Sequence, residues 1–350
     1  MSDNSIGLNR RAFGKSAILG GLASGLPGAP AIPSGIAIGS AMPADPTDKD
    51  LEFFAQLGVE YASVRLRIAD ATLERFIAIR RRLEAAGIRL WNIGLPELHC
   101  DPVLVLGLPG RDEKIEQYKA YLANLGKAGI PYTTYAHMAN IRIAKFYQTA
   151  VTTSRGGARV REFDISVART HPPSHGRDYT EDEIWKSFVY FIKAVLPAAE
   201  RAGVRIGLHQ DDPPVPSLGG VARVFRSFDA CRRAIDVAGS ENFGLCLCVG
   251  TWAEGGTAMG KDVFETIRQF GPKNKIFKVH FRNVSSPLPK FTETFVDDGY
   301  LDMYRLMKTL REVNFRGVMI PDHVPGGPVA GANLAYTIGY MRALRQSVNG

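Results

Sequence analysis

Four side chains with metal-binding chemistry each follow a short apolar run that predicts a β-strand. They are His209, Cys248, His280 and Asp322. Two imidazoles, a thiolate and a carboxylate form a mixed set of nitrogen, sulfur and oxygen donors. Such a set suits Mn²⁺, Fe²⁺, Co²⁺, Ni²⁺ or Zn²⁺, whereas Mg²⁺ and Ca²⁺ prefer oxygen ligands. A single histidine at a strand end is commonly structural, but four potential ligands at successive strand ends predict a divalent metal site.

The choice of Cys248 rather than Cys246 depends on strand geometry. Side chains alternate between the two faces of a strand, so both thiols of the segment 243–248 point the same way. Cys248 lies nearer the end of the strand, where a metal would bind, and we expect Cys246 to fill the core one layer deeper. The same alternation aligns Lys278 with His280 in the next strand.

Strand-like and helix-like segments alternate from residue 49 onward. The predicted strands cover 61–67, 88–93, 132–137, 204–209, 243–248, 276–281 and 317–320, and the predicted helices cover 71–86, 114–128, 181–202, 227–238, 261–269, 303–313 and 332–346. Helix–glycine–strand repeats of this kind imply parallel strands joined by right-handed crossovers. About eight strands, with no G-x-G-x-x-G after the first, favour a (β/α)8 TIM barrel over an open dinucleotide-binding sheet.

The active sites of TIM barrels lie at the C-terminal ends of the strands, where the four candidate ligands stand. The polar stretch 152–158 is expected to be a long loop or lid.

The composition permits one large domain. The chain has 350 residues, of which 45% are hydrophobic, with a net charge of +8 and a pI of about 9.3. The basic residues are scattered over predicted helix faces and no groove-reading motif is present, so we expect no nucleic-acid partner. The positive balance favours an anionic substrate instead. The four cysteines form no CxxC pair and show no disulfide-scaffold spacing, so we expect free thiols.

The first 31 residues have the pattern of an export signal. Arg10-Arg11, Phe13 and Lys15 resemble the twin-arginine signal, and a short Gly/Ala-rich run precedes the cleavage pattern Ala29-Pro30-Ala31. The run is too short and too rich in glycine to form a stable membrane anchor. We therefore expect a signal peptide over 1–31, a linker over 32–48, a single catalytic domain over 49–350, and a periplasmic location. A cytoplasmic protein with a chance Arg-Arg pair is the alternative.

Several motifs within 181–346 resemble those of the mannonate dehydratase family and occur in the family's order. His-Gln-Asp-Asp-Pro-Pro at 209–214 resembles its His-Pro-Asp-Asp-Pro-Pro, and Cys-Val-Gly-Thr at 248–251 resembles its Cys-x-Gly-Ser/Thr turn. The further matches are Gln-Phe-Gly-Pro at 269–272, His-Phe-Arg at 280–282, Phe-Thr-Glu at 291–293, Gly-Tyr-Leu-Asp-Met-Tyr at 299–304, Pro-Asp-His at 321–323, and Ala-Tyr with Ile-Gly within 335–339.

The resemblance implies a xylose isomerase-like barrel that uses Mn²⁺ or Fe²⁺ to dehydrate D-mannonate to 2-keto-3-deoxy-D-gluconate. It implies that the four strand-end residues are the metal ligands and that His323 and Tyr336 are the acid and the base, in either order. Loss of water from a sugar acid needs such a pair, because one group removes the proton beside the carboxylate and another protonates the leaving hydroxyl. The expected partner is a small-molecule sugar acid, and a homo-oligomer is left open.

Four further residues are candidates for substrate contacts. The planar guanidinium of Arg282 could pair with the substrate carboxylate, with a structural ion pair as the alternative. Asp211 and Asp212 could hold substrate hydroxyls, support a metal-bound histidine or cap the following turn. His137, at the end of an earlier predicted strand, is the fourth candidate.

Three positions depart from the family's motifs. Gln210 replaces a proline, Thr292 replaces the histidine before Glu293, and Ile320 replaces the arginine before Pro321. The last two changes remove groups that could bind or protonate an acidic substrate, whereas the four metal ligands are intact. Two alternatives therefore stay open: a periplasmic sugar isomerase or epimerase of the same superfamily, and a non-catalytic sugar-binding barrel.

Overall fold

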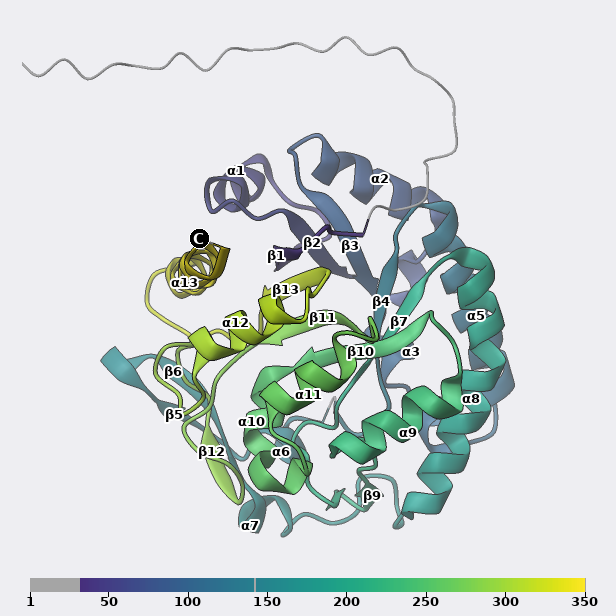
Figure 1. Ribbon diagram of the computed structural model, residues 1–350. Coiled ribbons are helices and arrows are strands. Elements are labelled where there is room, and N and C mark those ends of the chain that lie inside the picture. The colour runs from purple at the N-terminus through teal and green to yellow at the C-terminus, as the bar shows by residue number, and fades with distance from the viewer. Residues whose placement is uncertain (1–31, 142, 350) are drawn as a thin grey trace, which may run out of the picture.

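A closed barrel of parallel strands forms the centre of the molecule, and helices surround it (Figure 1). The structure, a computed structural model, describes residues 32–141 and 143–349. The export signal predicted over 1–31 lies outside the described residues. Among the helices that the structure describes, none combines the length and the apolar character needed to cross a membrane.

The eight barrel strands follow the order β1-β13-β11-β10-β7-β4-β3-β2. Their bounds are β1 Ile36–Met42, β2 Tyr61–Arg65, β3 Arg89–Gly94, β4 Tyr132–Ala136, β7 Arg205–His209, β10 Phe243–Cys248, β11 Ile276–Phe281 and β13 Gly317–Pro321. The predicted (β/α)8 barrel is thereby confirmed. Parallel strands bring their C-terminal ends to one rim, so β7, β10, β11 and β13, which are consecutive around the barrel, place their last residues side by side.

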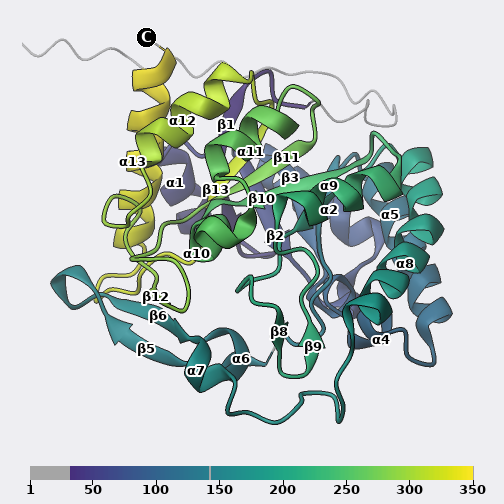
Figure 2. The ribbon, with the colours of Figure 1, turned by 60° about the horizontal axis from the view of Figure 1, so that its bottom comes forward.

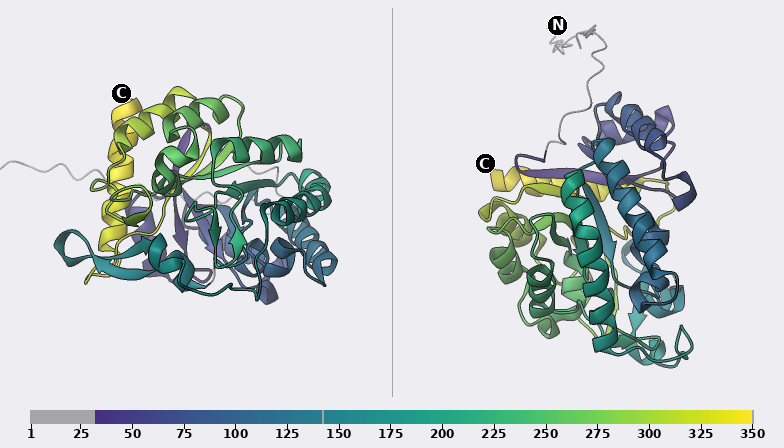
Figure 3. Two further views of the ribbon diagram at one scale, coloured as in Figure 1. Left: turned by 90° about the horizontal axis from the view of Figure 1, so that it is seen from below. Right: turned by 90° about the vertical axis from the view of Figure 1, so that its right-hand side faces the viewer.

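Helices cover the outside of the barrel (Figure 3). The long ones are α1 Asp48–Gln56, α2 Leu73–Glu84, α5 Arg111–Lys127, α8 Glu181–Ala202, α9 Phe228–Ala238, α11 Val263–Phe270, α12 Met303–Glu312 and α13 Ala332–Asn349, and the short ones are α3 Pro96–His99, α4 Pro102–Leu106, α6 Ala144–Tyr147, α7 Ile165–Ala168 and α10 Val249–Gly255. Helix α8 begins as predicted, because Thr180 and Glu183 form a reciprocal capping box. It ends at Gly203, which adopts the left-handed conformation that glycine tolerates.

The segment 32–48 is not the linker that its composition suggests, because it contains the barrel strand β1. This strand pairs with β13 on one side and with β2 on the other, and so closes the barrel. Close packing accounts for its small residues. A Cβ at Gly39 would lie 2.7 Å from the carbonyl oxygen of Tyr61 and 2.7 Å from a methyl carbon of Val318. The catalytic domain therefore begins before residue 49.

A small antiparallel sheet projects to one side of the barrel (Figure 2). Strands β5 Ala150–Thr153 and β6 Arg159–Asp164 form a hairpin, and β12 Lys290–Thr292 pairs with β6. The stretch 152–158, predicted as a long loop or lid, is mostly the turn of this hairpin and the end of β5. The polar residues that suggested a loop are exposed strand and turn residues.

Candidate active site

Three candidate ligand atoms converge at the C-terminal rim of the barrel. One donor atom each of His209, Cys248 and His280 lies within 4.8 Å of the other two. Asp322, which directly follows β13, places Oδ2 3.7 Å from Cys248 Sγ and Oδ1 3.7 Å from His280 Nδ1. The structure therefore brings together all four residues that the sequence singles out as metal ligands.

Both histidines of this cluster are in forms that can donate a ring nitrogen to a metal. His209 Nδ1 lies 2.6 Å from the backbone carbonyl oxygen of Gln210. A carbonyl only accepts hydrogen bonds, so Nδ1 is the donor in this contact and Nε2 is the ring nitrogen that a metal could bind. Nδ1 of His280 is buried with no hydrogen-bond partner among the described residues. Burial holds the pKa of His280 well below its usual range, so this ring is neutral.

Cys248 is fully buried, and burial raises the pKa of its thiol to about 11. Its backbone N–H donates to Oε1 of Gln210 at 2.9 Å, so a residue that departs from the family pattern steadies the strand end carrying the thiol. Metal ligation stabilises a thiolate, and a divalent ion would therefore deprotonate this group. The neutral imidazoles, the thiol and the carboxylate of Asp322 fit a borderline divalent metal.

A cavity of ≈ 930 Å³ opens at this rim, and three of the four candidate ligands, His209, His280 and Asp322, form part of its lining. This volume is typical of small-molecule sites. The lining also includes Arg65, Tyr147, Arg161, Lys278 and His323. Sequence reasoning gave a role only to His323 among these five, because the others belong to no recognisable motif. Strand alternation aligned Lys278 with His280, which was the one signal that could have placed it.

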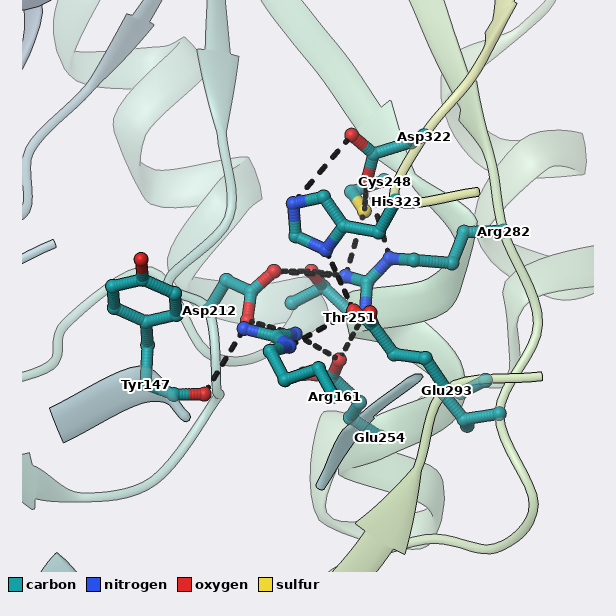
Figure 4. A network of polar contacts seen from close by, with 12 residues as sticks. Tyr147, Arg161, Asp212, Cys248, Thr251, Glu254, Arg282, Glu293, Asp322 and His323 are labelled. Carbon is teal, nitrogen blue, oxygen red and sulfur yellow. Dashed lines mark hydrogen bonds and ion pairs between the residues drawn. The ribbon is translucent and has the colours of Figure 1, made fainter. Parts of the chain in front are cut away.

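Arg282 joins four buried carboxylates beside the metal cluster (Figure 4). Its Nε lies 3.2 Å from Asp322, its Nη2 lies 2.8 Å from Asp212, and its Nη1 lies 2.9 Å from Glu293 and also contacts Glu254. Burial lowers the pKa of this guanidinium, but Glu254 and the other anionic groups outweigh burial and hold it well above its usual range. Every N–H group of Arg282 thus faces a protein acceptor. Of the two alternatives that the sequence leaves open for Arg282, this geometry matches the structural ion pair rather than pairing with a substrate carboxylate.

Arg161, on strand β6 of the hairpin, forms the second half of this network. Its guanidinium lies 3.1 Å from Asp212, 3.2 Å from Glu254 and 2.9 Å from Glu293. Two arginines therefore share these three carboxylates in the interior, where unpaired charges would be costly. Sequence reasoning missed Arg161 because it lies just after the stretch 152–158 predicted as a loop and within none of the predicted strands or helices. Only Val160 and Phe163 in the segment 159–164 are apolar, and they do not alternate regularly, so the sequence offered no clear strand signal here.

The two aspartates after β7 support the site and do not offer free oxygens to a substrate. Both oxygens of Asp212 accept from the guanidiniums described above. Burial raises the pKa of Asp212, but these guanidiniums outweigh burial and hold it below its usual range. Oδ2 of Asp211 accepts from the backbone N–H of Phe225 at 2.6 Å, and Oδ1 lies 3.6 Å from Arg223. Among the alternatives that the sequence leaves open, these contacts match a supporting role for both residues, and Asp212 also lines the cavity.

His323 lines the cavity next to Asp322. Its Nδ1 lies 2.6 Å from Oε1 of Glu293, so a buried carboxylate orients the ring, and Nε2, 3.9 Å from Oδ1 of Asp322, is the nitrogen that could exchange protons. Burial lowers the pKa of His323, but Asp322 and Glu293 outweigh burial and raise it above its usual range. The backbone of His323 has a φ of 47°, in the left-handed region that non-glycine residues rarely adopt. Such outliers cluster at active sites.

Tyr336 is not among the residues that line the cavity. It lies on α13 and is 42% exposed, its ring packs edge-on against Phe295, and the guanidinium of Arg155 stands 5.7 Å from its ring centroid. The expectation that Tyr336 stands beside His323 is therefore not met in the structure. Among the described residues, Tyr147 on α6 is the tyrosine that lines the cavity.

His137 also lies outside the cavity lining. It follows β4 and packs against the rings of Phe188 and Phe225, with centroid distances of 5.6 and 6.0 Å. Its side chain is buried, and burial lowers its pKa to about 3. The predicted substrate contact is thus corrected to a neutral histidine of the core between the barrel and α8.

Known proteins share this sequence pattern. The sequence model of the D-mannonate dehydratase (UxuA) family matches residues 168–341. The mannonate dehydratase of Streptococcus equi subsp. zooepidemicus is 30% identical over 275 residues, which cover 72% of this chain and 74% of that protein. Mannonate dehydratase 2 of Halalkalibacterium halodurans is 27% identical over 275 residues, which cover 71% of this chain and 78% of that protein.

Solved structures share the fold. The mannonate dehydratase from Streptococcus suis serotype 2 superposes with a TM-score of 0.79 at 25% identity, over 89% of this chain and 95% of that one. D-Psicose 3-epimerase from Clostridium cellulolyticum H10 superposes with a TM-score of 0.58 at 14% identity, over 90% of this chain and 99% of that one, and so shares the barrel alone. From the matched motifs, the relatives and the barrel, we conclude that the chain belongs to the mannonate dehydratase family of hydro-lyases.

Proposed function

We propose that this chain dehydrates D-mannonate to 2-keto-3-deoxy-D-gluconate, using Mn²⁺ or Fe²⁺ held by the four strand-end ligands. The observation that carries the proposal is the convergence of His209, Cys248, His280 and Asp322 at the rim, where all of them except Cys248 line a cavity that His323 also lines. A bound divalent ion supplies Lewis-acid stabilisation of the negative charge that develops on the substrate. The remaining chemistry is proton transfer by the chain's own side chains.

The reaction removes the proton at C2, beside the carboxylate, and the hydroxyl at C3. One water leaves, and the resulting enol becomes the 2-keto acid, so the atoms balance. His323 is suited to exchange a proton at Nε2, because Glu293 holds Nδ1. The phenol of Tyr147 is the second group in the cavity lining that could exchange a proton at its hydroxyl oxygen. Either order of base and acid satisfies the proton balance.

The buried network around Arg161 and Arg282 positions these groups. Glu293 accepts from both guanidiniums and from His323 Nδ1, so the ring orientation depends on the network. Asp322, next to the ring, accepts from Nε of Arg282. The network therefore connects one proposed metal ligand with the proposed proton-exchanging histidine.

Incubation of metal-loaded protein with D-mannonate, followed by an assay for a 2-keto-3-deoxy acid, tests the reaction. We expect product with Mn²⁺ or Fe²⁺, none after chelation, and a loss of kcat on the order of 100-fold in His323→Asn. No product over a range of divalent metals would exclude D-mannonate as substrate. Exchange of solvent protons into a neutral ketose without loss of water would favour an isomerase or epimerase. The apolar Ile320 in the cavity lining is compatible with such a neutral substrate.

We further propose that residues 1–31 direct twin-arginine export to the periplasm. The support is the pair Arg10-Arg11 with Phe13 and the apolar run that follows. Cell fractionation of the full chain should place it in the periplasm, and replacing both arginines by lysine should retain it in the cytoplasm. Retention of the unchanged chain in the cytoplasm would contradict this proposal.

A further inference from the structure

Lys278 is a buried lysine that forms no ion pair with the residues that the structure describes. Its residue is 3% exposed, and among the described residues no carboxylate lies within ion-pairing distance of its ammonium group. A charged lysine is rarely buried unless it is paired, because removal of the charge from water is costly. Lys278 nonetheless lines the cavity, two residues before the metal-cluster residue His280.

A local irregularity of the barrel explains how Lys278 reaches the cavity. Between β10 and β11 the pairing shifts, so that Leu245 opposes Ile276 while Cys246 opposes Lys278, and Phe277 is the extra residue. Phe277 belongs to a buried apolar cluster, here called the plug, which consists of Ala37, Tyr61, Trp91, Tyr132, Phe277, Val318 and Ile320. Lys278, the next residue along the chain, lines the cavity. The bulge allows the ring of Phe277 to join the apolar cluster while Lys278, which shares a strand face with His280, lines the cavity.

Strand β3 repeats the arrangement. Between β2 and β3 the pairing shifts from Ala62–Leu90 to Ser63–Asn92, and Trp91 is the extra residue. Trp91 joins the same apolar plug, and Asn92 lines the cavity. Two bulges therefore each place an aromatic ring in the plug and a polar side chain in the cavity.

The polar atoms near this plug have unused hydrogen-bonding capacity. Oγ of Ser63 and Oδ1 of Asn92 are buried with no hydrogen-bond partner among the described residues, and both residues line the cavity. Arg65, the last residue of β2, also lines the cavity and takes part in no ion pair of the described chain. Buried polar groups are nearly always satisfied, so unpartnered atoms on one side of a cavity point to a polar ligand.

We propose that Lys278 and Arg65 bind the carboxylate of the sugar-acid substrate, with Ser63 and Asn92 contacting its hydroxyls. The inference rests on the proposed function and specifies how the site selects an acid over a neutral sugar. Arg282 is committed to protein carboxylates, so the cation for the substrate must come from elsewhere in the lining. Lysine and arginine both form charge-assisted hydrogen bonds with carboxylates.

Calorimetric binding to the metal-loaded full chain tests the subsite with a matched pair of ligands, D-gluconate and the neutral alditol D-sorbitol. Lys278→Met keeps the side-chain length and removes the charge. We expect it to weaken gluconate binding on the order of 10- to 100-fold, because hydrogen bonds to charged groups are strong, and to leave sorbitol binding nearly unchanged. Equal weakening of both ligands, or unchanged gluconate binding, would overturn the proposal.

Three further variants complete the design. Lys308→Met removes a positive charge from the exposed face of α12 and should change binding by no more than about twofold. Lys278→Arg should restore most of the preference for gluconate. Arg65→Met, at the exposed end of β2, should also weaken gluconate binding while leaving sorbitol binding nearly unchanged. If Lys278→Met does not fold, Arg65→Met provides the test of the subsite. We expect the thermal midpoint of Lys278→Met to equal or exceed that of the unchanged protein, because an unpaired buried charge is removed.

The outcome separates this inference from the proposed function. Failure to dehydrate D-mannonate, together with charge-dependent gluconate binding at Lys278, would refute the proposed reaction and support the subsite. Dehydration of D-mannonate with gluconate binding unaffected in Lys278→Met would support the reaction and refute the subsite.

Discussion

Nη2 of Arg282 lies 2.8 Å from Oδ2 of Asp212, and the two side chains are 1% and 5% exposed. This ion pair connects the loop after β7 with the loop after β11, two strands that carry candidate metal ligands. Buried ion pairs are stable only when the remaining hydrogen-bonding groups of both partners are satisfied. Arg282 meets this condition through further carboxylates, and Asp212 meets it through Arg161.

Arg282→Met should therefore destabilise the fold strongly. The change leaves several buried carboxylates without one of their two cations, and breaking a buried pair costs about 3–5 kcal/mol. Urea unfolding followed by circular dichroism measures the loss. The matched control is Arg268→Met, because the pair between Arg268 and Glu312 is 46% and 43% exposed and should contribute less than about 1 kcal/mol. Equal losses in the two variants would contradict the importance of the network.

Cys248→Ser should lower the amount of metal that the protein retains. A thiolate binds borderline divalent ions more strongly than a hydroxyl does, and Cys248 belongs to the cluster of converging donor atoms. Elemental analysis after dialysis gives the metal content per chain. Cys246→Ala is the matched control, because this thiol lies two residues earlier on β10 and outside the cluster, and its loss should leave the metal content unchanged. Full metal content in Cys248→Ser would refute the ligand assignment.

The four candidate metal ligands could be predicted because each one follows from a short, local sequence pattern. His209, Cys248 and His280 stand at or next to the ends of apolar runs, and strand ends in a parallel barrel share one rim. Strand alternation then distinguished Cys248 from Cys246. By contrast, β1 was mistaken for a linker, because a close-packed strand of small residues has the composition of one.

The ion-pair network could not be predicted, because it depends on tertiary contacts between distant segments. Arg161 and Glu293 are 132 positions apart and meet because β12 pairs with β6, so that the backbone N–H of Glu293 donates to the carbonyl oxygen of Arg161 at 2.9 Å. The guanidinium of Arg282 matches a carboxylate in either a substrate or a protein, and sequence alone did not distinguish the two. The position of Tyr336 likewise depends on how α13 packs, which a short motif does not specify.

The structure makes different predictions for the two candidate tyrosines. Tyr147→Phe should lower kcat for D-mannonate on the order of 100-fold with little change in KM, because Tyr147 belongs to the cavity lining and its phenol is the proposed proton-exchanging group. Tyr336→Phe should change kcat by less than about threefold, because its ring packs beside Phe295 and Arg155 instead. Steady-state kinetics of the metal-loaded variants decide between them. A large loss in Tyr336→Phe alone would show that α13 brings this residue to the substrate during the reaction.

The stability of the protein should fall on acidification, partly because of two buried histidines. Burial lowers the pKa of His137 and of His99 to about 3, whereas an unfolded histidine has a pKa near 6.5. Below about pH 6.5 the unfolded chain binds protons that the folded chain does not, so the unfolded state is favoured as pH falls. The stabilisation is present above this pH and is lost progressively down to about pH 3, by up to about 1.4 kcal/mol per pH unit for each histidine.

His137→Phe should make this loss shallower. Phenylalanine keeps an aromatic ring between Phe188 and Phe225 and removes one of the two titrations, while His99 is untouched. Urea unfolding of the metal-free proteins at pH 7, 6, 5 and 4 gives the free energy of unfolding as a function of pH. The slope below pH 6 should be smaller in the variant by about 1 kcal/mol per pH unit. Parallel curves for the two proteins would mean that His137 is protonated in the folded state, contrary to its burial among aromatic rings.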